Sequence, residues 1–166
     1  MKQTQLKSFM AATLLAGVQV FNAEDVQING INYRLRAEDL TAQVIRTPDA
    51  AGEIVLPQTV NYGGKAYALT SISDSAFARC EDLETVTIPE SVTSIGKRSF
   101  SECYILTSVK IPSSVTCIGY AVFWECHSLK DVYLVAMKRN LIKVYGEAYS
   151  MTMFKEYMSG NFGKRV

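Results

Sequence analysis

The chain has 166 residues, of which 48% are hydrophobic and 20% are charged, and its formal net charge at pH 7 is +1. This length suits one domain with a core of its own, and the composition excludes a disordered or fibrous protein. The basic residues form no dense stripe that could neutralise phosphates, so nucleic acid is excluded as a partner.

Residues 1–23 have the layout of a secretory signal peptide. Lys2 and Lys7 precede an apolar run over residues 9–18, and acidic residues begin only at Glu24. We therefore predict export, with cleavage after Ala23. The alternative, a first core helix, is disfavoured because the stretch lacks helical amphipathicity. No later apolar run is long enough to span a bilayer, so no transmembrane segment is expected after signal removal.

Residues 24–70 are predicted to form an N-terminal β cap with a partial repeat. The pair Asn29–Gly30 lies between alternating apolar residues, which is the strongest short-range signal for a β-hairpin. Further strands are expected over residues 41–45 and 53–56. A second hairpin is expected to turn at Gly63–Gly64 before the next segment begins.

Residues 71–134 form three repeated units, which follow one another at a fixed step along the chain. Residues of one kind recur at this step, which chance does not produce over so many positions. The recurring sets are Ile72, Ile95 and Ile118; Phe77, Phe100 and Phe123; Cys80, Cys103 and Cys126; Leu83, Leu106 and Leu129; and Val86, Val109 and Val132. One unit buries too little apolar surface to offset the backbone entropy that it loses, so the units must fold as a stack.

Each unit contains the L-x-x-L-x-L spacing of a leucine-rich repeat, as in residues 83–88. Its alternating part predicts a short strand with Val86 and Ile88 facing inward, and the following proline ends the hydrogen-bond ladder. Gly96 and Gly119 suit a tight backbone turn. Residues 97–103 are expected to form one helical turn on the convex side.

Residues 135–166 lose the period. Residues 144–149 echo residues 117–123 at a spacing stretched to about 26, which predicts a degenerate closing repeat. Residues 151–166 are interpreted either as a helical cap or as a disordered tail. From Lys138 onward the chain carries six basic and two acidic residues, so this end is locally positive.

The repeat resembles the BspA-type leucine-rich repeats, whose form is I-G-x-x-A-F-x-x-C-x-x-L-x-x-V-x-I-P-x-x-V-T. The matching residues are Ile95, Gly96, Phe100, Cys103, Leu106, Val109, Ile111, Pro112, Val115 and Thr116. Residues 24–69 also look like the leader that precedes such repeats in exported proteins of Bacteroides-type bacteria. The resemblance implies a right-handed solenoid, mainly β with short helical turns, and a role in surface adhesion or protein binding. The chain departs from the pattern in its few repeats, in Ser73 at a glycine position, and in its atypical end.

The sequence offers no catalytic or metal-binding constellation. Cys80, Cys103 and Cys126 share one repeat position, so we favour a ladder of buried thiols over disulfides, while Cys117 replaces the serine of the earlier units. His127 is the only histidine, and no other ligands converge at the spacing of a zinc site. Because no nucleophile motif, phosphate loop or carboxylate pair is present, we predict that the chain is not an enzyme and needs no cofactor. A hydrolase is the disfavoured alternative.

The exposed positions of the repeat strands are the predicted binding site. They form three columns: Glu84, Thr107 and Lys130; Thr85, Ser108 and Asp131; and Thr87, Lys110 and Tyr133. Parallel stacking places these columns on the concave sheet, where repeat proteins usually bind, although a merely solvated face is the alternative. Lys110, Lys130 and Tyr133 form the most partner-like cluster, since interfaces favour aromatic residues.

Tyr120 and Trp124 replace polar residues of the earlier repeats. Such late aromatics either pack under a terminal cap or form an exposed adhesive patch. The prediction is a secreted or cell-surface module that binds a protein or glycan, with host extracellular or cell-surface molecules among the candidates. The alternative is a structural or remnant fragment of a longer adhesin without a ligand of its own.

Overall fold

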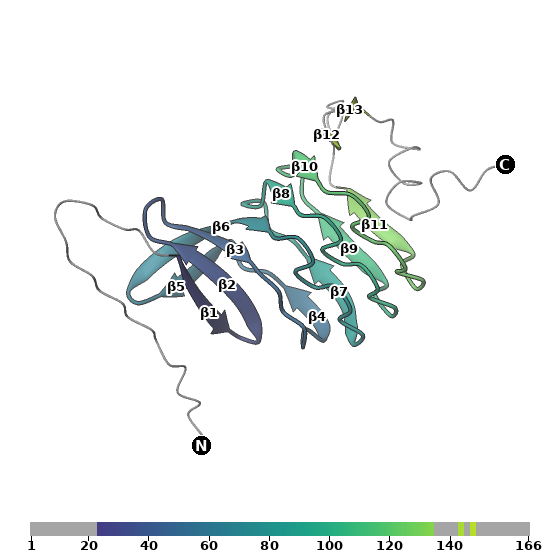
Figure 1. Ribbon diagram of the computed structural model, residues 1–166, viewed down its shortest axis with the longest axis horizontal. Helices are drawn as coiled ribbons and strands as arrows, with labels where there is room; N and C mark the ends of the chain where they lie inside the picture. Colours follow the sequence, from purple (N-terminus) through teal and green to yellow (C-terminus); the bar gives the residue numbers. More distant parts are fainter. Residues whose placement is uncertain (1–22, 135–142, 145–146, 149–166) are drawn as a thin grey trace, which may run out of the picture.

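The computed structural model describes residues 23–134, 143–144 and 147–148, which form strands and turns and contain no helix (Figure 1). The strands in chain order are β1 (Glu24–Ile28), β2 (Ile31–Arg36), β3 (Thr41–Val44), β4 (Gly52–Val55), β5 (Thr59–Tyr62), β6 (Lys65–Ile72), β7 (Leu83–Thr87), β8 (Ser94–Ile95), β9 (Ser108–Ile111), β10 (Cys117–Ile118), β11 (Asp131–Leu134), β12 (Lys143–Val144) and β13 (Glu147–Ala148).

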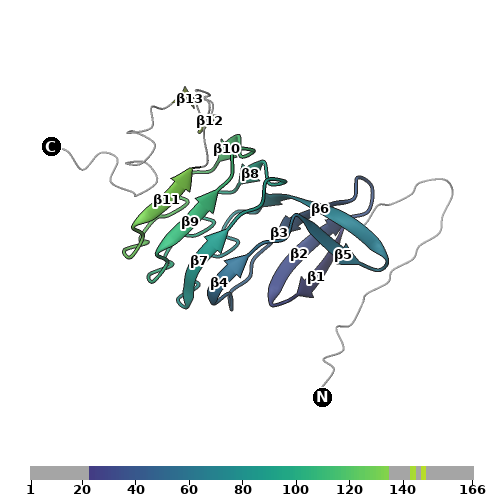
Figure 2. The same cartoon turned by 180° about the vertical axis from the view of Figure 1, so that it is seen from behind.

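These strands form two sheets that run the length of the stack (Figure 2). The long sheet has the order β1-β2-β3-β6-β8-β10-β12-β13, and β5 pairs with β6 beside this path. The four-stranded sheet has the order β11-β9-β7-β4, and all of its pairs are parallel. Between β7, β9 and β11 the register advances by one repeat, so Val86 lies beside Val109 and Val109 beside Val132. The predicted stack of repeat strands is therefore confirmed.

Two hairpins build the N-terminal part of the fold, as the sequence predicts. The β1–β2 hairpin turns at Asn29 and Gly30, whose φ angles of 50° and 79° are both positive, and the β5–β6 hairpin turns at Gly63 and Gly64. The strands expected near residues 41–45 and 53–56 are β3 and β4. Because β3 pairs in parallel with β6 and β4 with β7, both sheets continue without a break from this part into the repeats.

The third side of each repeat is a turn and not the helical turn that the sequence predicts. Residues 74–79, 97–102 and 120–125 make some hydrogen bonds within their own segment but direct other N–H groups to the neighbouring repeat: the N–H of Phe77 donates to the carbonyl of Ser99 (2.7 Å), and the N–H of Phe100 donates to that of Val122 (3.0 Å). A helical turn would keep these donors within its own segment. Two residues of each turn adopt positive φ, for example Arg98 at 51° and Glu102 at 60°.

Columns of identical side chains fill the interior between these three sides. The ring of Phe77 stacks on Phe100 with centroids 5.2 Å apart, and Phe100 stacks on Phe123 at 5.5 Å. All three rings are buried. Burying such a side chain stabilises a fold by about 1.5–3 kcal/mol, and stacked aromatic pairs add about 0.5–1.5 kcal/mol. The apolar positions that recur in the sequence are therefore the core of the stack.

Gly96 and Gly119 are required by close approach of the backbone and not by a turn with positive φ. A Cβ atom on Gly119 would lie 2.6 Å from the carbonyl carbon of Gly96, and one on Gly96 would meet the backbone of residues 73–74 equally closely. Real Cβ atoms do not show contacts under 3.0 Å, so neighbouring repeats can approach only without a side chain here. Ser73 occupies the equivalent position one repeat earlier, where its neighbour is the end of β3 and not another repeat. Its N–H donates to the carbonyl of Val44, and a side chain fits there.

Beyond β11, β12 pairs in parallel with β10, and Cys117 lies beside Lys143. This pairing agrees with the stretched spacing that the sequence suggests for a closing unit. The remainder of the region from 135 to 166, including the predicted cap or tail over 151–166, lies outside the described residues.

Ser99 carries a buried hydroxyl without a hydrogen-bond partner in the described structure, at a position that Ala76 occupies in the preceding repeat. We expect Ser99→Ala to raise the free energy of unfolding by about 1 kcal/mol, because a buried unpaired polar group is removed. The reverse change, Ala76→Ser, should lower it by about 1–3 kcal/mol. Denaturant unfolding of both variants checks this pair; a loss of stability in Ser99→Ala would contradict the assignment.

Candidate binding surfaces

The four-stranded sheet aligns the columns that the sequence predicts. Thr85 lies beside Ser108 and Thr87 beside Lys110, and β11 continues both columns with Asp131 and Tyr133 in backbone register. In the column of Glu84, Thr107 and Lys130, Glu84 lies in β7, whereas Thr107 and Lys130 immediately precede β9 and β11. There the N–H of Thr107 donates to the carbonyl of Glu84 (2.8 Å), and the N–H of Lys130 donates to that of Thr107 (3.0 Å). We call the outer side of this sheet, made by these nine residues, the sheet face.

Strand β4 extends two of these columns by one member, which sequence reasoning missed. Glu53 lies beside Thr85 and Val55 beside Thr87, and the side chain of Val55 is 66% exposed. The signal was present, because Ile54, Leu56 and Pro57 copy the end of a repeat. However, Val55 precedes Thr87 by more than one period, since the β5–β6 hairpin is inserted between them.

Polar and charged groups of the sheet face are available to a partner. Glu84, Lys110 and Lys130 are exposed and make no ion pair with any side chain that the structure describes. Thr107 is the exception, because its hydroxyl donates to the carbonyl of Glu84 at 3.0 Å and so supports the stack. Elsewhere this face has short hydroxyl side chains, which accept and donate hydrogen bonds without hindering close approach.

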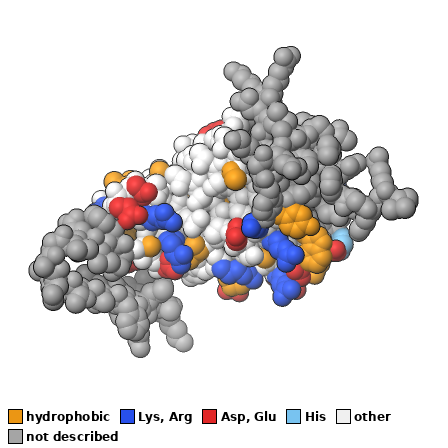
Figure 3. All heavy atoms as spheres, turned by 45° about the horizontal axis from the view of Figure 1, so that its top comes forward, with side chains coloured by type: hydrophobic (Ala, Val, Ile, Leu, Met, Phe, Trp, Pro, Cys, Tyr) orange, Lys and Arg blue, Asp and Glu red, His pale blue; other side chains and the backbone are white. Residues whose placement is uncertain are grey.

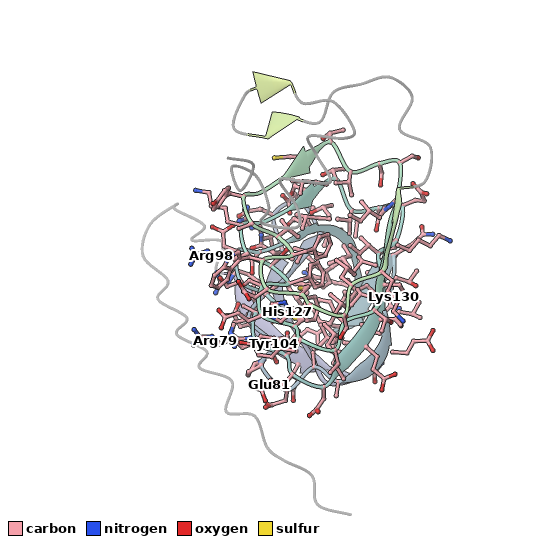
Figure 4. All side chains as sticks on the ribbon, turned by 90° about the vertical axis from the view of Figure 1, so that its right-hand side faces the viewer. Arg79, Glu81, Arg98, Tyr104, His127 and Lys130 are labelled. Carbon is pink, nitrogen blue, oxygen red and sulfur yellow. The ribbon has the colours of Figure 1, made fainter. Side chains whose placement is uncertain are left out.

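The opposite side of the stack carries an aromatic and basic cluster, which we call the turn face (Figure 3). Its contacts connect successive repeats: the guanidinium of Arg98 lies 5.7 Å from the centroid of Trp124, the rings of Tyr104 and His127 stack at 6.0 Å, and Arg79 pairs with Glu102 at 3.0 Å. Figure 4 shows Arg79 and Arg98 projecting on one side of the stack and Lys130 on the other.

Tyr120 and Trp124 both remain partly exposed on the turn face, at 49% and 39%. Trp124 also reaches back toward the preceding repeat, because its ring lies beside Arg98. The terminal cap of the alternative interpretation falls on residues outside the described part of the chain, so both interpretations of these side chains stay predictions.

Nε2 of His127 lies 3.0 Å from a carboxylate oxygen of Glu125, and its ring stacks on that of Tyr104. Among the described residues, no three His, Cys, Asp or Glu side chains gather in a way that could hold a metal ion. The same residues include no helix with the length and apolar character to cross a membrane.

The cysteine ladder is confirmed, and its thiols take part in the stacking of repeats. Each thiol donates to a carbonyl of the preceding turn of chain: Cys80 to Thr47 (3.1 Å), Cys103 to Phe77 (3.0 Å) and Cys126 to Phe100 (2.9 Å). The neighbouring Cys103 thiol and burial raise the pKa of Cys80. The Cys126 thiol and burial likewise raise the pKa of Cys103 to about 12. All four cysteines are free, and Cys117 is exposed.

Parallel strands at a regular period, with stacked columns of Phe, Cys, Leu and Val, define a leucine-rich-repeat solenoid. The family model described as "BspA type Leucine rich repeat region (6 copies)" matches residues 65–161. The chain therefore belongs to the BspA-type leucine-rich-repeat family, as its motif suggests.

Solved structures of bacterial leucine-rich-repeat proteins are similar to this chain. A leucine-rich repeat protein from Bacteroides ovatus has a TM-score of 0.61 and 31% identity, over 66% of this chain and 29% of that one. A leucine rich cell surface protein from Faecalibacterium prausnitzii has a TM-score of 0.58 and 28% identity, over 68% of this chain and 32% of that one. The chain thus spans about a third of their length.

A leucine-rich repeat protein from Bacteroides capillosus shares the fold, with a TM-score of 0.58 at 23% identity, over 68% of this chain and 99% of that one. The comparison with curated proteins found no match.

Thiol reactivity distinguishes the ladder from the exposed cysteine. We expect Cys117 to react rapidly with a thiol reagent in the folded chain, Cys126 more slowly, and Cys80 and Cys103 only on unfolding. Burial and a raised pKa together protect Cys80 and Cys103. The Cys103 thiol lowers the pKa of Cys126, so only partial burial slows its reaction relative to the exposed Cys117. Stopped-flow titration of the wild type and Cys117→Ser checks this; a fast phase that survives in Cys117→Ser would contradict it.

Proposed function

We propose that this chain is a secreted or cell-surface module that binds a protein or glycan through the sheet face and performs no catalysis. The observation that carries the proposal is the backbone register of successive repeats, which brings polar residues into columns, together with Lys110 and Lys130, which no described side chain pairs. Support comes from membership of a repeat-protein family and from the similar F. prausnitzii protein, which is described as a cell surface protein.

The nine residues of the sheet face carry balanced charge, with Glu84 and Asp131 against Lys110 and Lys130, but the two lysines provide local sites for a partner with hydrogen-bonding groups and some acidic character. Lys110 and Lys130 lie in neighbouring repeats, and Tyr133 follows Lys110 in the same column by backbone register. Tyrosine is enriched at the energetic centres of interfaces, and the lysines would add attraction to acidic groups of a partner. A host extracellular protein or a glycan with carboxylate groups has this chemistry.

A matched pair of triple variants tests the site. Lys110→Ala/Lys130→Ala/Tyr133→Ala removes two cations and a tyrosine from the sheet face. We expect about tenfold or greater loss of affinity for whichever partner is captured from a panel of immobilised extracellular proteins and glycans, because the variant loses a tyrosine, a residue type that dominates binding energy, and two charges that attract acidic groups. Surface plasmon resonance measures the affinities.

The control is Arg79→Ala/Arg98→Ala/Tyr104→Ala, which makes the same chemical change on the opposite side. It should leave the affinity unchanged. Loss of affinity in the control but not in the first variant would move the site to the turn face. If the whole panel fails to bind the wild type, the alternative of a structural fragment without a ligand becomes the better account.

Export is tested at the N-terminus. Secretion of the full chain from a Gram-negative host should yield a periplasmic or extracellular product that begins at Glu24, because the signal peptide is removed after Ala23. Mass spectrometry of the purified product reads this directly. An intact N-terminus on a cytoplasmic product would contradict export.

A further inference from the structure

Strand β4 borders a groove at the N-terminal end of the four-stranded sheet. The groove has a volume of about 590 Å³ and lies between β4 with the segment that follows it and the tip of the β1–β2 hairpin. Figures 1 and 2 both show β4 beside this hairpin. Apolar side chains line both walls, with Ile28 and Ile31 on the hairpin and Ile54 and Val60 opposite. The groove therefore offers apolar contacts directly next to a sheet edge.

The edge of β4 on this side has backbone groups without a strand partner. The strand is the last in its sheet, with β7 as its one neighbour among the described residues. The N–H of Gly52 donates to the carbonyl of Asp82 (2.6 Å), and the N–H of Leu56 donates to that of Thr87 (3.0 Å). Since alternate residues of a parallel strand bond to opposite sides, Glu53 and Val55 direct their N–H and C=O groups into the groove.

The charges of the groove have a single sign. Asp49 and Glu53 are its charged lining residues in the described structure, and both are exposed. Neither makes an ion pair with a described side chain. A partner that matches the groove therefore combines an extended backbone, apolar side chains and at least one Lys or Arg.

We propose that the groove binds an extended, basic polypeptide segment that adds to β4 as a fifth strand of the four-stranded sheet. The segment would exchange backbone hydrogen bonds with Glu53 and Val55, pack apolar side chains against Ile28 and Ile31, and place a cation near Asp49. Strand addition explains why the groove and the open edge occur together, since an unpaired edge is a template for another strand.

This site is distinct from the sheet face. It uses the backbone edge of β4 and the hairpin tip, whereas the nine residues of the sheet face belong to β7, β9 and β11 or immediately precede β9 and β11. The variant Lys110→Ala/Lys130→Ala/Tyr133→Ala should therefore retain peptide binding, so the two proposals can fail separately.

Peptide chemistry provides the first test, with the full-length wild-type chain. The probe is a fluorescent hexapeptide in which valine alternates with lysine, and its affinity is measured by anisotropy. Two further versions carry N-methyl groups on one or the other set of alternate backbone amides. We expect one methylated version to bind about tenfold more weakly or worse, because it loses the hydrogen bonds to β4, while the other still binds. Hydrogen exchange should show the amides of Glu53 and Val55 protected by the parent peptide.

Protein variants provide the second test. Val55→Pro removes an outward N–H without affecting the ladder to β7, and should weaken binding of the lysine peptide. Asp49→Lys/Glu53→Lys should reverse the preference, from the lysine peptide to one with glutamate in its place. Glu81→Lys/Glu84→Lys makes the same charge change outside the groove and should keep the lysine preference.

Three results would overturn the proposal. One is absence of binding by the lysine peptide, and another is equal binding of both methylated versions and the parent, which would exclude strand pairing. The third is a preference that reverses in Glu81→Lys/Glu84→Lys but not in Asp49→Lys/Glu53→Lys, which would place the peptide elsewhere. If Val55→Pro does not fold, the methylated peptides and the charge reversal still decide the question.

Discussion

Backbone hydrogen bonds between successive repeats are the interaction on which the whole structure depends. They occur on every side of the stack: Lys130 to Thr107 beside the four-stranded sheet, Gly119 to Ile95 in the long sheet, and Phe100 to Val122 between turns. Because the donors and acceptors of one repeat are paired by its neighbours, an isolated repeat would leave them to water. The same bonds fix the register of the paired segments, because a one-residue slip within a strand would turn its side chains to the other face, whereas an insertion between strands, such as the β5–β6 hairpin, leaves the columns aligned.

Side-chain columns follow from this constraint, and they select residues by the space between repeats. Phenylalanine rings stack at about the distance that separates the repeats, at 5.2 and 5.5 Å. The cysteine position needs a small, mostly apolar side chain that can still donate to a carbonyl 2.9–3.1 Å away, which a thiol does. At Gly96 and Gly119 the backbones approach so closely that any side chain is excluded. Conformation alone would have allowed another residue there, because neither glycine has a positive φ.

The period in the sequence was enough to predict the core, the strand register and the columns of the sheet face, because all three depend on side chains that recur at one offset. It was not enough to predict the third side. A short segment with a buried phenylalanine suits a helical turn as well as an open turn, and the hydrogen bonds that decide between them, such as Phe77 to Ser99, are made to another repeat. Glu53 and Val55 were missed for a related reason, since the inserted hairpin lengthens their offset from β7 beyond the regular period.

The backbone hydrogen bonds between repeats stop at the ends of the stack. At the N-terminal end, the two sheets differ in whether their last repeat strand finds a further partner. In the long sheet, β6 finds a parallel partner in β3, and the β1–β2 hairpin continues the pairing outward. In the four-stranded sheet the chain that precedes β4 belongs to β3 and the loop after it, so β4 receives no partner on its outer side among the described residues. The hairpin tip approaches this edge as the wall of a groove instead of pairing with it. The N-terminal region, which does not follow the repeat, thus places an open strand edge, apolar side chains and two carboxylates together. A regular repeat could not present this combination, because both edges of its strand are paired by its neighbours.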